Sequence, residues 1–315
     1  MKIAIMESLG ISEEELKKHE ASFVAQGHEF VSFEKTGDPD KLVDEAKDAD
    51  VMILANMPMP ADVLRRCENL KYIDVAFTGV DHVGLEAAKD KNIAVSNASG
   101  YATEAVAELV IGMALSLMRY MPQVDEKCRE GGTKVGFIGN EITGKTVGIV
   151  GLGKIGTRSA ELFHAFGADV LAYSRHIHAD APAYVSQVSL EEVLAKSDIV
   201  VLHCPLNDST RGLINADRLA LMKKSAILIN VARGPVVVSQ DLADALNNGT
   251  SAAAGIDVFD KEPPLDPADP LLHAKNTVVT PHVAFATKES MSKRAVIVFD
   301  NLASWLAGQQ KNVVL

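Results

Sequence analysis

The chain has 315 residues, 47% of them hydrophobic, and a formal net charge of −11. This length and apolar content suffice for a large core and favour two domains over one. The acidic balance, without any cluster of Lys or Arg, argues against a nucleic-acid-binding surface, and no apolar run reaches the length of a membrane span. The N-terminal stretch reads as a strand rather than a signal peptide, and three widely spaced cysteines indicate a reducing compartment. We therefore predict a cytoplasmic protein that binds neither nucleic acid nor membrane.

Short apolar runs alternate with helical stretches from residue 1 to about 98. Ser12-Glu-Glu-Glu15 opens one of these helices with a capping-box pattern. The alternation predicts a parallel sheet covered by helices. Two turns, 56–60 and 77–82, follow predicted strands, which is where open α/β sheets bind ligands, although this segment alone favours the simpler interpretation that Gly79 only satisfies its turn. The predicted strands are 2–6, 29–33, 51–54, 72–75 and 93–95.

Residues 99–121 carry the longest helical pattern, with Ser99 or Thr103 as the predicted N-cap. Apolar residues extend beyond one face, which favours a helix between domains or at a subunit interface. The glycine-bearing segment 125–140 predicts an irregular arm or loop. The residues at helical spacing are Val106, Leu109, Val110, Met113 and Leu117.

A glycine-rich turn follows the short apolar run 146–150 and precedes a helical pattern. Gly151, Gly153 and Gly156 have the G-x-G-x-x-G spacing. In a dinucleotide site the first glycine permits the tight turn, the second lets the backbone approach a pyrophosphate, and the third lets helix and strand pack closely. The helix N-terminus then presents N–H groups and the positive end of its dipole to the phosphates. This stretch predicts a nucleotide site.

Five more strands are predicted after the glycine turn, with helices between them. Ser189-Leu-Glu-Glu192 and Ser239 provide predicted helix caps, and Gly249 is expected to end one helix. Six strands in this arrangement predict a doubly wound nucleotide domain. A last helix, about 287–306 and closed by Gly308, is expected to return to the first domain. The five strands are 169–173, 198–203, 226–231, 253–258 and 277–280.

Several motifs occur together in an order that resembles the D-isomer-specific 2-hydroxyacid dehydrogenase family across nearly the whole chain. This family includes glyoxylate and hydroxypyruvate reductases and phosphoglycerate dehydrogenases. The resemblance implies two doubly wound parallel-sheet α/β domains: a Rossmann cofactor domain (99–286) inserted in a flavodoxin-like substrate domain (1–98 plus 287–315). It also implies a homodimer formed through the cofactor domain. The motifs are Gly151-Leu-Gly-Lys-Ile-Gly156, His203-Cys-Pro-Leu206 with Thr210-Arg-Gly-Leu-Ile214, Ile229-Asn-Val-Ala-Arg-Gly-Pro235, Gly255-Ile-Asp-Val-Phe-Asp-Lys-Glu-Pro263 and Thr280-Pro-His-Val-Ala284.

The family's three catalytic positions fall on Arg233, Glu262 and His282, each just after a predicted strand of the nucleotide domain. Arg233 offers a planar fork that can hold a carboxylate and polarise the adjacent carbonyl. His282 is the natural proton donor because histidine titrates near neutral pH, and a hydrogen bond from its ring to Glu262 would favour imidazolium and orient the ring. Taken singly, these residues would more simply be a surface charge, a solvated acid and a packed histidine. Their joint placement favours catalysis.

The resemblance also implies the remainder of the site. Thr78 and Gly79 would offer backbone N–H groups to the substrate carboxylate, and Asn56 or Met57 would line the other wall. Arg233 and His282 complete the predicted substrate set. Within the cofactor set, Asp257 would face the nicotinamide carboxamide, and Thr103 would lie at the domain junction. That set comprises Thr103, Gly151, Leu152, Gly153, Lys154, Ile155, Gly156, Ser174, Arg175, His203, Cys204, Pro205, Thr210, Val231, Ala232, Arg233, Asp257, His282 and Ala284.

The second strand of the nucleotide domain ends differently from that of an NAD-dependent enzyme. Such enzymes place Asp or Glu there to bind the ribose 2′-hydroxyl, whereas this chain has Ser174 followed by Arg175 and His176. A guanidinium can pair with a 2′-phosphate, so NADP is favoured over NAD. The alternative is that Arg175 stacks on adenine and either cofactor binds. We predict no metal site, because no acidic or Cys ligands lie near His176 and His178.

The substrate class follows from the loop 56–60, which carries no basic residue. A small or aliphatic 2-oxo acid is favoured, such as glyoxylate, hydroxypyruvate or a branched-chain analogue. D-3-phosphoglycerate dehydrogenase is the alternative; it would need Arg65 or Arg119 to reach the substrate, and often carries a regulatory domain for which this chain leaves no room. Formate oxidation is disfavoured because formate dehydrogenases of this fold carry Gln at the position of Glu262. The non-enzyme alternative is an NAD(P)-sensing, corepressor-like binding protein, which would retain the same three residues but for which no partner-binding extension is visible.

Overall fold

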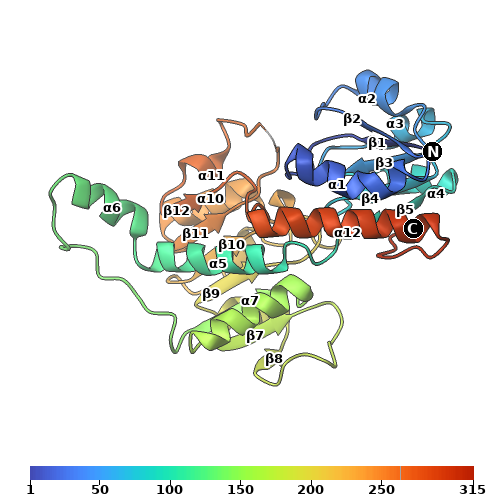
Figure 1. The fold of residues 1–315 in the computed structure, drawn as a ribbon. Coiled ribbons are helices and arrows are strands. Elements are labelled where there is room, and N and C mark those ends of the chain that lie inside the picture. Colours follow the sequence, from blue (N-terminus) through green and yellow to red (C-terminus); the bar gives the residue numbers. More distant parts are fainter. Residues whose placement is uncertain (263) are drawn as a thin grey trace. The chain divides into compact units, whose positions relative to one another are not determined.

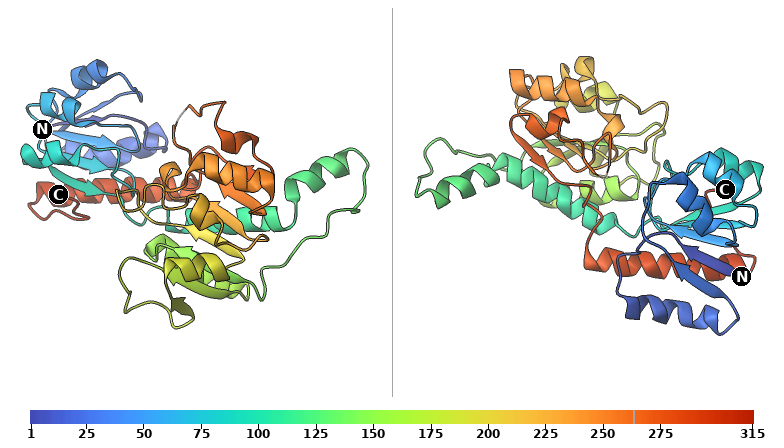
Figure 2. Two further views of the ribbon diagram at one scale, coloured as in Figure 1. Left: turned by 180° about the vertical axis from the view of Figure 1, so that it is seen from behind. Right: turned by 90° about the horizontal axis from the view of Figure 1, so that it is seen from above.

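The structure, a computed structural model, describes residues 1–262 and 264–315. Pro263, which closes one of the family motifs, lies outside the described residues. The chain divides into two compact units (Figure 1). Unit 1 comprises Met1–Ala102 and Ala286–Leu315, and unit 2 comprises Thr103–Phe285, so residues 99–102 and Ala286 group with unit 1. Both termini therefore belong to unit 1 (Figure 2).

Unit 1 contains a five-stranded parallel sheet with the order β2-β1-β3-β4-β5. This is the flavodoxin-like order of a doubly wound fold. Every residue of β3 and β4 is buried, as expected for parallel strands that are covered on both faces. Each of the five predicted strands is confirmed; four agree within one residue at either end, and β5 extends two residues beyond its predicted end, to Asn97. Their bounds are β1 (Lys2–Ile5), β2 (Glu29–Ser32), β3 (Val51–Leu54), β4 (Tyr72–Val75) and β5 (Ala94–Asn97).

The first and last helices of unit 1 pack on each other. In α1 (Glu13–Val24) the Ser12 hydroxyl accepts a hydrogen bond from the Glu15 N–H, as the capping pattern predicts. The last helix, α12 (Lys288–Leu306), contacts α1 and β4 and places Trp305 in a ring stack on Tyr72, with centroids 4.6 Å apart. The other helices of this unit are α2 (Pro39–Ala46), α3 (Ala61–Arg66) and α4 (Leu85–Asp90).

Unit 2 contains a seven-stranded parallel sheet with the order β12-β11-β10-β9-β6-β7-β8. Strand order reverses on the two sides of β6, so the glycine turn after β6 lies at the switch point where doubly wound sheets bind nucleotides. The sequence predicted six strands and missed β8, which has three residues and one buried position, too few for a pattern. The strands are β6 (Thr146–Val150), β7 (Asp169–Tyr173), β8 (Val185–Gln187), β9 (Ile199–Leu202), β10 (Ile227–Asn230), β11 (Ala253–Ile256) and β12 (Thr277–Val279).

Three predictions about the helices of unit 2 need correction. Helix α5 begins at Thr103, so neither Ser99 nor Thr103 occupies its N-cap position, and α10 is preceded by Val238 while Ser239 is its first residue. The segment expected to be irregular contains α6, which the sequence did not reveal because none of its residues is buried. Helix α6 protrudes from the rest of unit 2, and the chain after it loops back toward the sheet (Figure 2). The helices are α5 (Thr103–Met118), α6 (Met121–Arg129), α7 (Lys154–Ala165), α8 (Leu190–Lys196), α9 (Ala216–Leu219), α10 (Ser239–Asn248), α11 (Pro270–His273) and the 3-10 turn η1 (Gly234–Val236).

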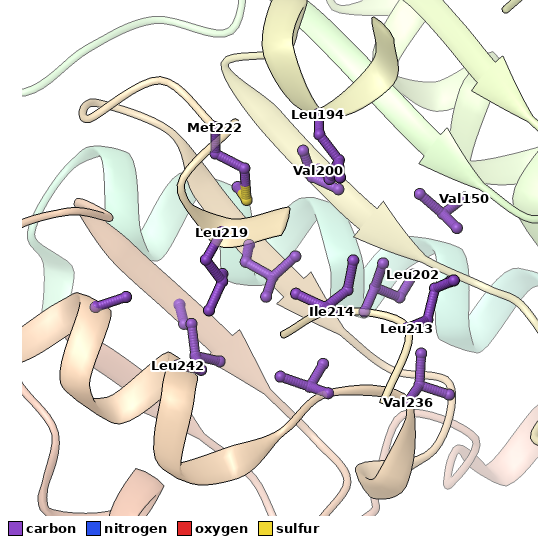
Figure 3. Close-up of a cluster of buried hydrophobic side chains, with 14 of the residues drawn as sticks. Val150, Leu194, Val200, Leu202, Leu213, Ile214, Leu219, Met222, Val236 and Leu242 are labelled. Atoms are coloured by element: carbon purple, nitrogen blue, oxygen red, sulfur yellow. The ribbon is translucent and has the colours of Figure 1, made fainter. Parts of the chain in front are cut away.

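Apolar side chains form two clusters in unit 2. One joins α8, α9 and α10 to the sheet and includes Leu194, Leu202 and Leu242 (Figure 3). The other joins α5 and α7 to the sheet and includes Val110 and Phe163. Because α5 contacts α7 and three strands, it needs apolar residues over more than one narrow face. In the described part of the chain no single helix is long and apolar enough to span a membrane, although α5 and α6 together pass that test across a 58° bend.

Candidate active site

The glycine turn after β6 matches the requirements of a dinucleotide. Gly151 has φ +103°, and a Cβ there would lie 2.8 Å from the His203 carbonyl carbon; a Cβ at Gly156 would lie 2.0 Å from the Gly151 oxygen. Gly153, by contrast, has no atom within 4 Å of its Cβ position. It precedes α7 without a side-chain cap, so the first N–H groups of that helix are available to a phosphate. The described residues therefore fit a bound dinucleotide.

Ser174 lies at the end of β7, in the position where an acidic residue would bind a ribose. Its hydroxyl accepts a hydrogen bond of 2.8 Å from the Leu152 N–H in the glycine turn. The next residue, Arg175, is exposed. Gln187 in β8, which the sequence did not identify, holds this loop through two hydrogen bonds of 2.8 Å to the His178 backbone. The loop that carries Arg175 is thus tied to the sheet.

The loop after β9 was predicted to contact the cofactor. The His203 N–H donates to the Val150 oxygen at 2.8 Å, which joins this loop to the strand before the glycine turn. Burial lowers the pKa of His203 to about 3 and raises that of the Cys204 thiol to about 11, so both groups are neutral near pH 7. The Thr210 hydroxyl donates to the Pro205 oxygen at 2.6 Å. In the structure Thr210 therefore stabilises its own loop.

Arg233 follows β10, and two neighbouring residues hold its backbone. Asn230 is 1% exposed; its side-chain oxygen accepts from the Ala232 N–H at 3.1 Å, and its amide donates to the Arg233 oxygen at 3.0 Å. Gly234 contacts the next loop so closely that a Cβ would lie 2.1 Å from the Phe259 carbonyl carbon. Since this second loop leads to Glu262, the two loops form one packed layer at the carboxyl edge of the sheet.

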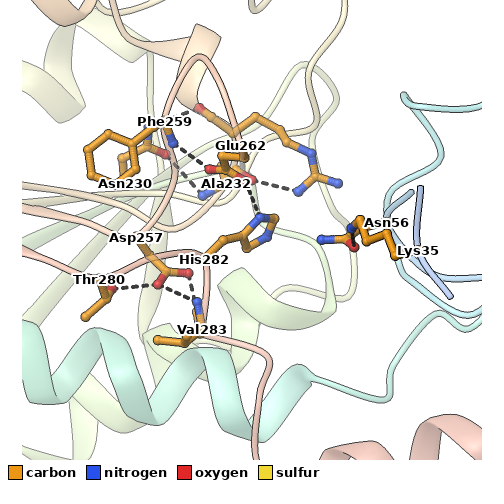
Figure 4. A network of polar contacts seen from close by, with 12 residues as sticks. Lys35, Asn56, Asn230, Ala232, Asp257, Phe259, Glu262, Thr280, His282 and Val283 are labelled. Carbon is orange, nitrogen blue, oxygen red and sulfur yellow. Dashed lines mark hydrogen bonds and ion pairs between the residues drawn. The ribbon is translucent and has the colours of Figure 1, made fainter. Parts of the chain in front are cut away.

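His282 and Glu262 form a direct pair, with His282 Nδ1 against Glu262 Oε2 (Figure 4). Glu262 Oε1 accepts a hydrogen bond from the Phe259 N–H at 2.6 Å, so both carboxylate oxygens are engaged. The side chains are 15% and 18% exposed, which leaves the pair accessible but largely screened from water. His282 has φ +53°, a conformation uncommon outside glycine, and the surrounding loop must hold it there.

Asp257 supplies that support. It is fully buried at the end of β11, and its Oδ1 accepts from the Thr280 hydroxyl at 2.6 Å and from the Val283 N–H at 2.8 Å. Its Oδ2 accepts from the Ala284 N–H at 2.9 Å (Figure 4 shows the bonds to Oδ1). Burial raises the pKa of Asp257, and these hydrogen bonds oppose that rise. The Asp257 carboxylate thus fixes the loop on both sides of His282. Its contact with the nicotinamide carboxamide stays a prediction.

The predicted substrate residues of unit 1 follow β3 and β4. Thr78 and Gly79 are half-buried, and within the described residues their N–H groups donate no hydrogen bond. Met57 is fully buried, so Asn56 is the more exposed residue of its pair. Lys35, which the sequence did not single out, donates to Asn56 Oδ1 at 2.6 Å and lies 3.4 Å from buried Glu7 Oε2. A cation therefore does adjoin the loop 56–60, brought from the segment after β2.

Comparison with known proteins identifies the family. Residues 111–284 match the model for the D-isomer specific 2-hydroxyacid dehydrogenase, NAD binding domain. The chain belongs to this family. It is 36% identical over 299 residues to hydroxypyruvate reductase from Blautia hydrogenotrophica and 38% identical over 296 residues to glycerate dehydrogenase from Methylorubrum extorquens; each match covers 91% of this chain and 92% of the relative. An acyclic imino acid reductase, Bsp5, solved in complex with NADPH and D-Arg, has a TM-score of 0.92 and 28% identity over 100% of both chains.

Family membership confirms the resemblance drawn from the motifs and the fold class of two parallel-sheet α/β units. This D-2-hydroxyacid dehydrogenase is an oxidoreductase whose Rossmann unit binds a nicotinamide dinucleotide. The glycine turn and the edge formed by β10, β11 and β12 lie in that matched region.

Proposed function

We propose that this dehydrogenase reduces a small 2-oxo acid at C2 with NADPH, and that Arg233, Glu262 and His282 carry out the chemistry. The observation that carries the proposal is the Glu262–His282 pair, built on the same sheet edge as the Arg233 loop. The adjacent parallel strands β10, β11 and β12 bring these loops together. The three proposed catalytic residues that the loops carry are nevertheless 20 or more positions apart in the sequence. A largely water-screened acid–base pair on the same sheet edge as an arginine suits an oxygen that gains negative charge during reduction.

Each residue has a distinct role in this mechanism. When bound, the reduced nicotinamide supplies the hydride to C2. Arg233 holds the substrate carboxylate and polarises the carbonyl, and His282 donates a proton through Nε2 to the oxygen that becomes the hydroxyl. Glu262 occupies Nδ1, which fixes the ring and stabilises imidazolium. In the oxidative direction neutral His282 accepts the hydroxyl proton.

The N–H groups of Thr78 and Gly79 are proposed to bind the substrate carboxylate together with Arg233. Their lack of other acceptors among the described residues supports this role. Lys35 is already matched by Glu7 and Asn56, so its charge does not demand an anionic substrate side chain. We favour glyoxylate, hydroxypyruvate or an aliphatic 2-oxo acid. D-3-phosphoglycerate dehydrogenase is the second candidate, because Lys35 could turn to a phosphate.

NADP is proposed as the preferred cofactor, with NAD as the alternative. Ser174 uses its hydroxyl on the glycine turn and brings no negative charge to the ribose, while exposed Arg175 can pair with a 2′-phosphate. The reductase Bsp5, of similar structure, was solved with NADPH.

A homodimer through unit 2 is proposed from the arm that follows α6. Val135 and Ile138 in this arm are 81% and 89% exposed, which is unusual for large apolar side chains. A pocket of about 300 Å³ lies between the end of α5 and the starts of β10 and β11, lined by Leu117, Ser251 and neighbours. We expect light scattering to give a dimer mass that falls in Ile138→Asp, whereas Ile177→Asp, a change at an equally exposed residue outside the arm, should leave it unchanged.

The test of the proposed function is the loss of NADPH and, separately, NADH absorbance with glyoxylate, hydroxypyruvate, pyruvate, 2-oxoisocaproate and phosphohydroxypyruvate. Turnover should be lost in His282→Ala and Arg233→Ala but kept in His273→Ala, a control at an exposed histidine of the same unit. Turnover with phosphohydroxypyruvate alone would favour the second candidate. Binding of NADPH without turnover of any acid would favour an NAD(P)-sensing, corepressor-like binding protein.

A further inference from the structure

Two fully buried polar side chains meet in unit 1. Asp74 lies in β4 and Asn301 in α12, and both are 0% exposed. Asn301 Nδ2 donates to Asp74 Oδ1 at 3.1 Å and to the Asn97 oxygen at 3.0 Å. Burying polar groups is costly unless they are hydrogen-bonded, and apolar residues would fill this core at lower cost. Their presence therefore calls for an explanation beyond packing.

Asn97, the last residue of β5, extends this pair to the proposed substrate loop. Its Nδ2 donates to the Thr78 oxygen at 2.8 Å, and its Oδ1 accepts from the Ser99 N–H at 3.2 Å. The Thr78 carbonyl and the Gly79 N–H belong to one planar peptide unit and point in opposite directions. By holding the carbonyl on its inner side, Asn97 directs the Gly79 N–H outward.

Asn301, which lies between Asp74 and Asn97 in this network, is held by a further hydrogen bond. Asn312 Nδ2 donates to Asn301 Oδ1 at 2.8 Å, and the Asn97 N–H donates to the Asn312 oxygen at 3.1 Å. The amide of Asn301 is therefore fixed in one orientation. Burial raises the pKa of Asp74 to about 8, against the opposing influence of Asn301 and Tyr72, so the side chain is mainly neutral at pH 7. The network thus contains no uncompensated buried charge near neutrality.

We propose that Asn97 and Asn301 are positioning residues: the chain Asp74–Asn301–Asn97–Thr78 fixes the Thr78–Gly79 peptide so that the Gly79 N–H faces the carboxylate of the substrate. Neither asparagine touches the substrate. The proposal rests on the proposed function, because it explains the orientation of a loop to which that function assigns substrate binding.

Kinetics of Asn97→Asp provide the first test. Asp keeps the shape and can still accept from the Ser99 N–H, but an ionised Asp cannot donate to the Thr78 oxygen. We expect KM for the 2-oxo acid to rise about tenfold, with kcat and KM for NADPH within about twofold of wild type. Asn69→Asp, at an exposed asparagine of the same unit, should change none of these values. Asn97→Ser is the second variant should Asn97→Asp not fold, and Asn301→Ala should change KM in the same direction.

Amide hydrogen exchange of residues 76–84 provides the second test and requires no turnover. Exchange in this segment should be faster in Asn97→Asp than in wild type or Asn69→Asp. A lowered Tm with unchanged KM and unchanged exchange in the segment would assign Asn97 a purely structural role and overturn the proposal. If wild type reduced no 2-oxo acid, the proposed function would fail, while the exchange measurement would still decide whether Asn97 holds the loop.

Discussion

Replacement of Glu262 by Gln tests the proposed proton donor most directly. Glu262 uses one oxygen on His282 Nδ1 and the other on the Phe259 N–H, and Gln can satisfy the latter with its own carbonyl oxygen. Its NH₂ group would then face His282 and disfavour imidazolium. The exposed fractions of 15% and 18% mean that solvent screens this pair only weakly.

The expected loss of activity follows from the free energy of a hydrogen bond to a charged partner at a site that is largely shielded from water. We take this as about 2–3 kcal/mol, which corresponds to a fall of about 30- to 150-fold in kcat/KM for reduction. Stopped-flow or steady-state NADPH consumption at pH 7 measures this effect.

Asp266→Asn is the matched control, since Asp266 is a partly exposed acid in the same loop region and its replacement should leave kcat/KM unchanged. A wild-type kcat/KM in Glu262→Gln would refute the assignment of Glu262 as the functional partner of His282.

Three further predictions concern other parts of the molecule. Because burial raises the pKa of Asp74 from 3.8 to about 8, unfolding releases a proton between these values, and wild-type stability should fall as pH rises across that window, by up to about 1.4 kcal/mol per unit. Asp74→Asn should remove this slope in urea unfolding at pH 5 and 8; parallel dependences would contradict the reasoning. Gly234→Ala should lower both Tm and kcat because its Cβ would meet the Phe259 backbone at 2.1 Å, whereas Gly153→Ala should keep Tm and weaken NADPH binding. Ser174→Asp should raise KM for NADPH at least about tenfold and favour NADH, and an unchanged cofactor ratio would exclude this loop as the determinant.

Local sequence determined the elements that depend on near neighbours. The apolar runs of β3, β4 and β6 predicted strands because parallel strands are buried on both faces. The strand–glycine–helix stretch around Gly151 is encoded within about ten residues. This stretch and the other motifs along the chain together identified the family. The sequence could not reveal α6 or β8, because exposed or very short elements carry little hydrophobic pattern.

Tertiary structure alone decided which distant groups meet. The pair of Glu262 and His282 requires neighbouring strands in the right order, and the contact of Leu152 with Ser174 joins the ends of the neighbouring strands β6 and β7. Lys35 reaches Asn56 across 21 residues, and Asn301 reaches Asp74 across 227. Such contacts depend on strand order and on how loops pack at the sheet edge, and no local pattern of residues encodes either. The sequence alone thus determined most of the helices and strands and the family. The tertiary structure determined the hydrogen-bonded environment in which each proposed site residue acts.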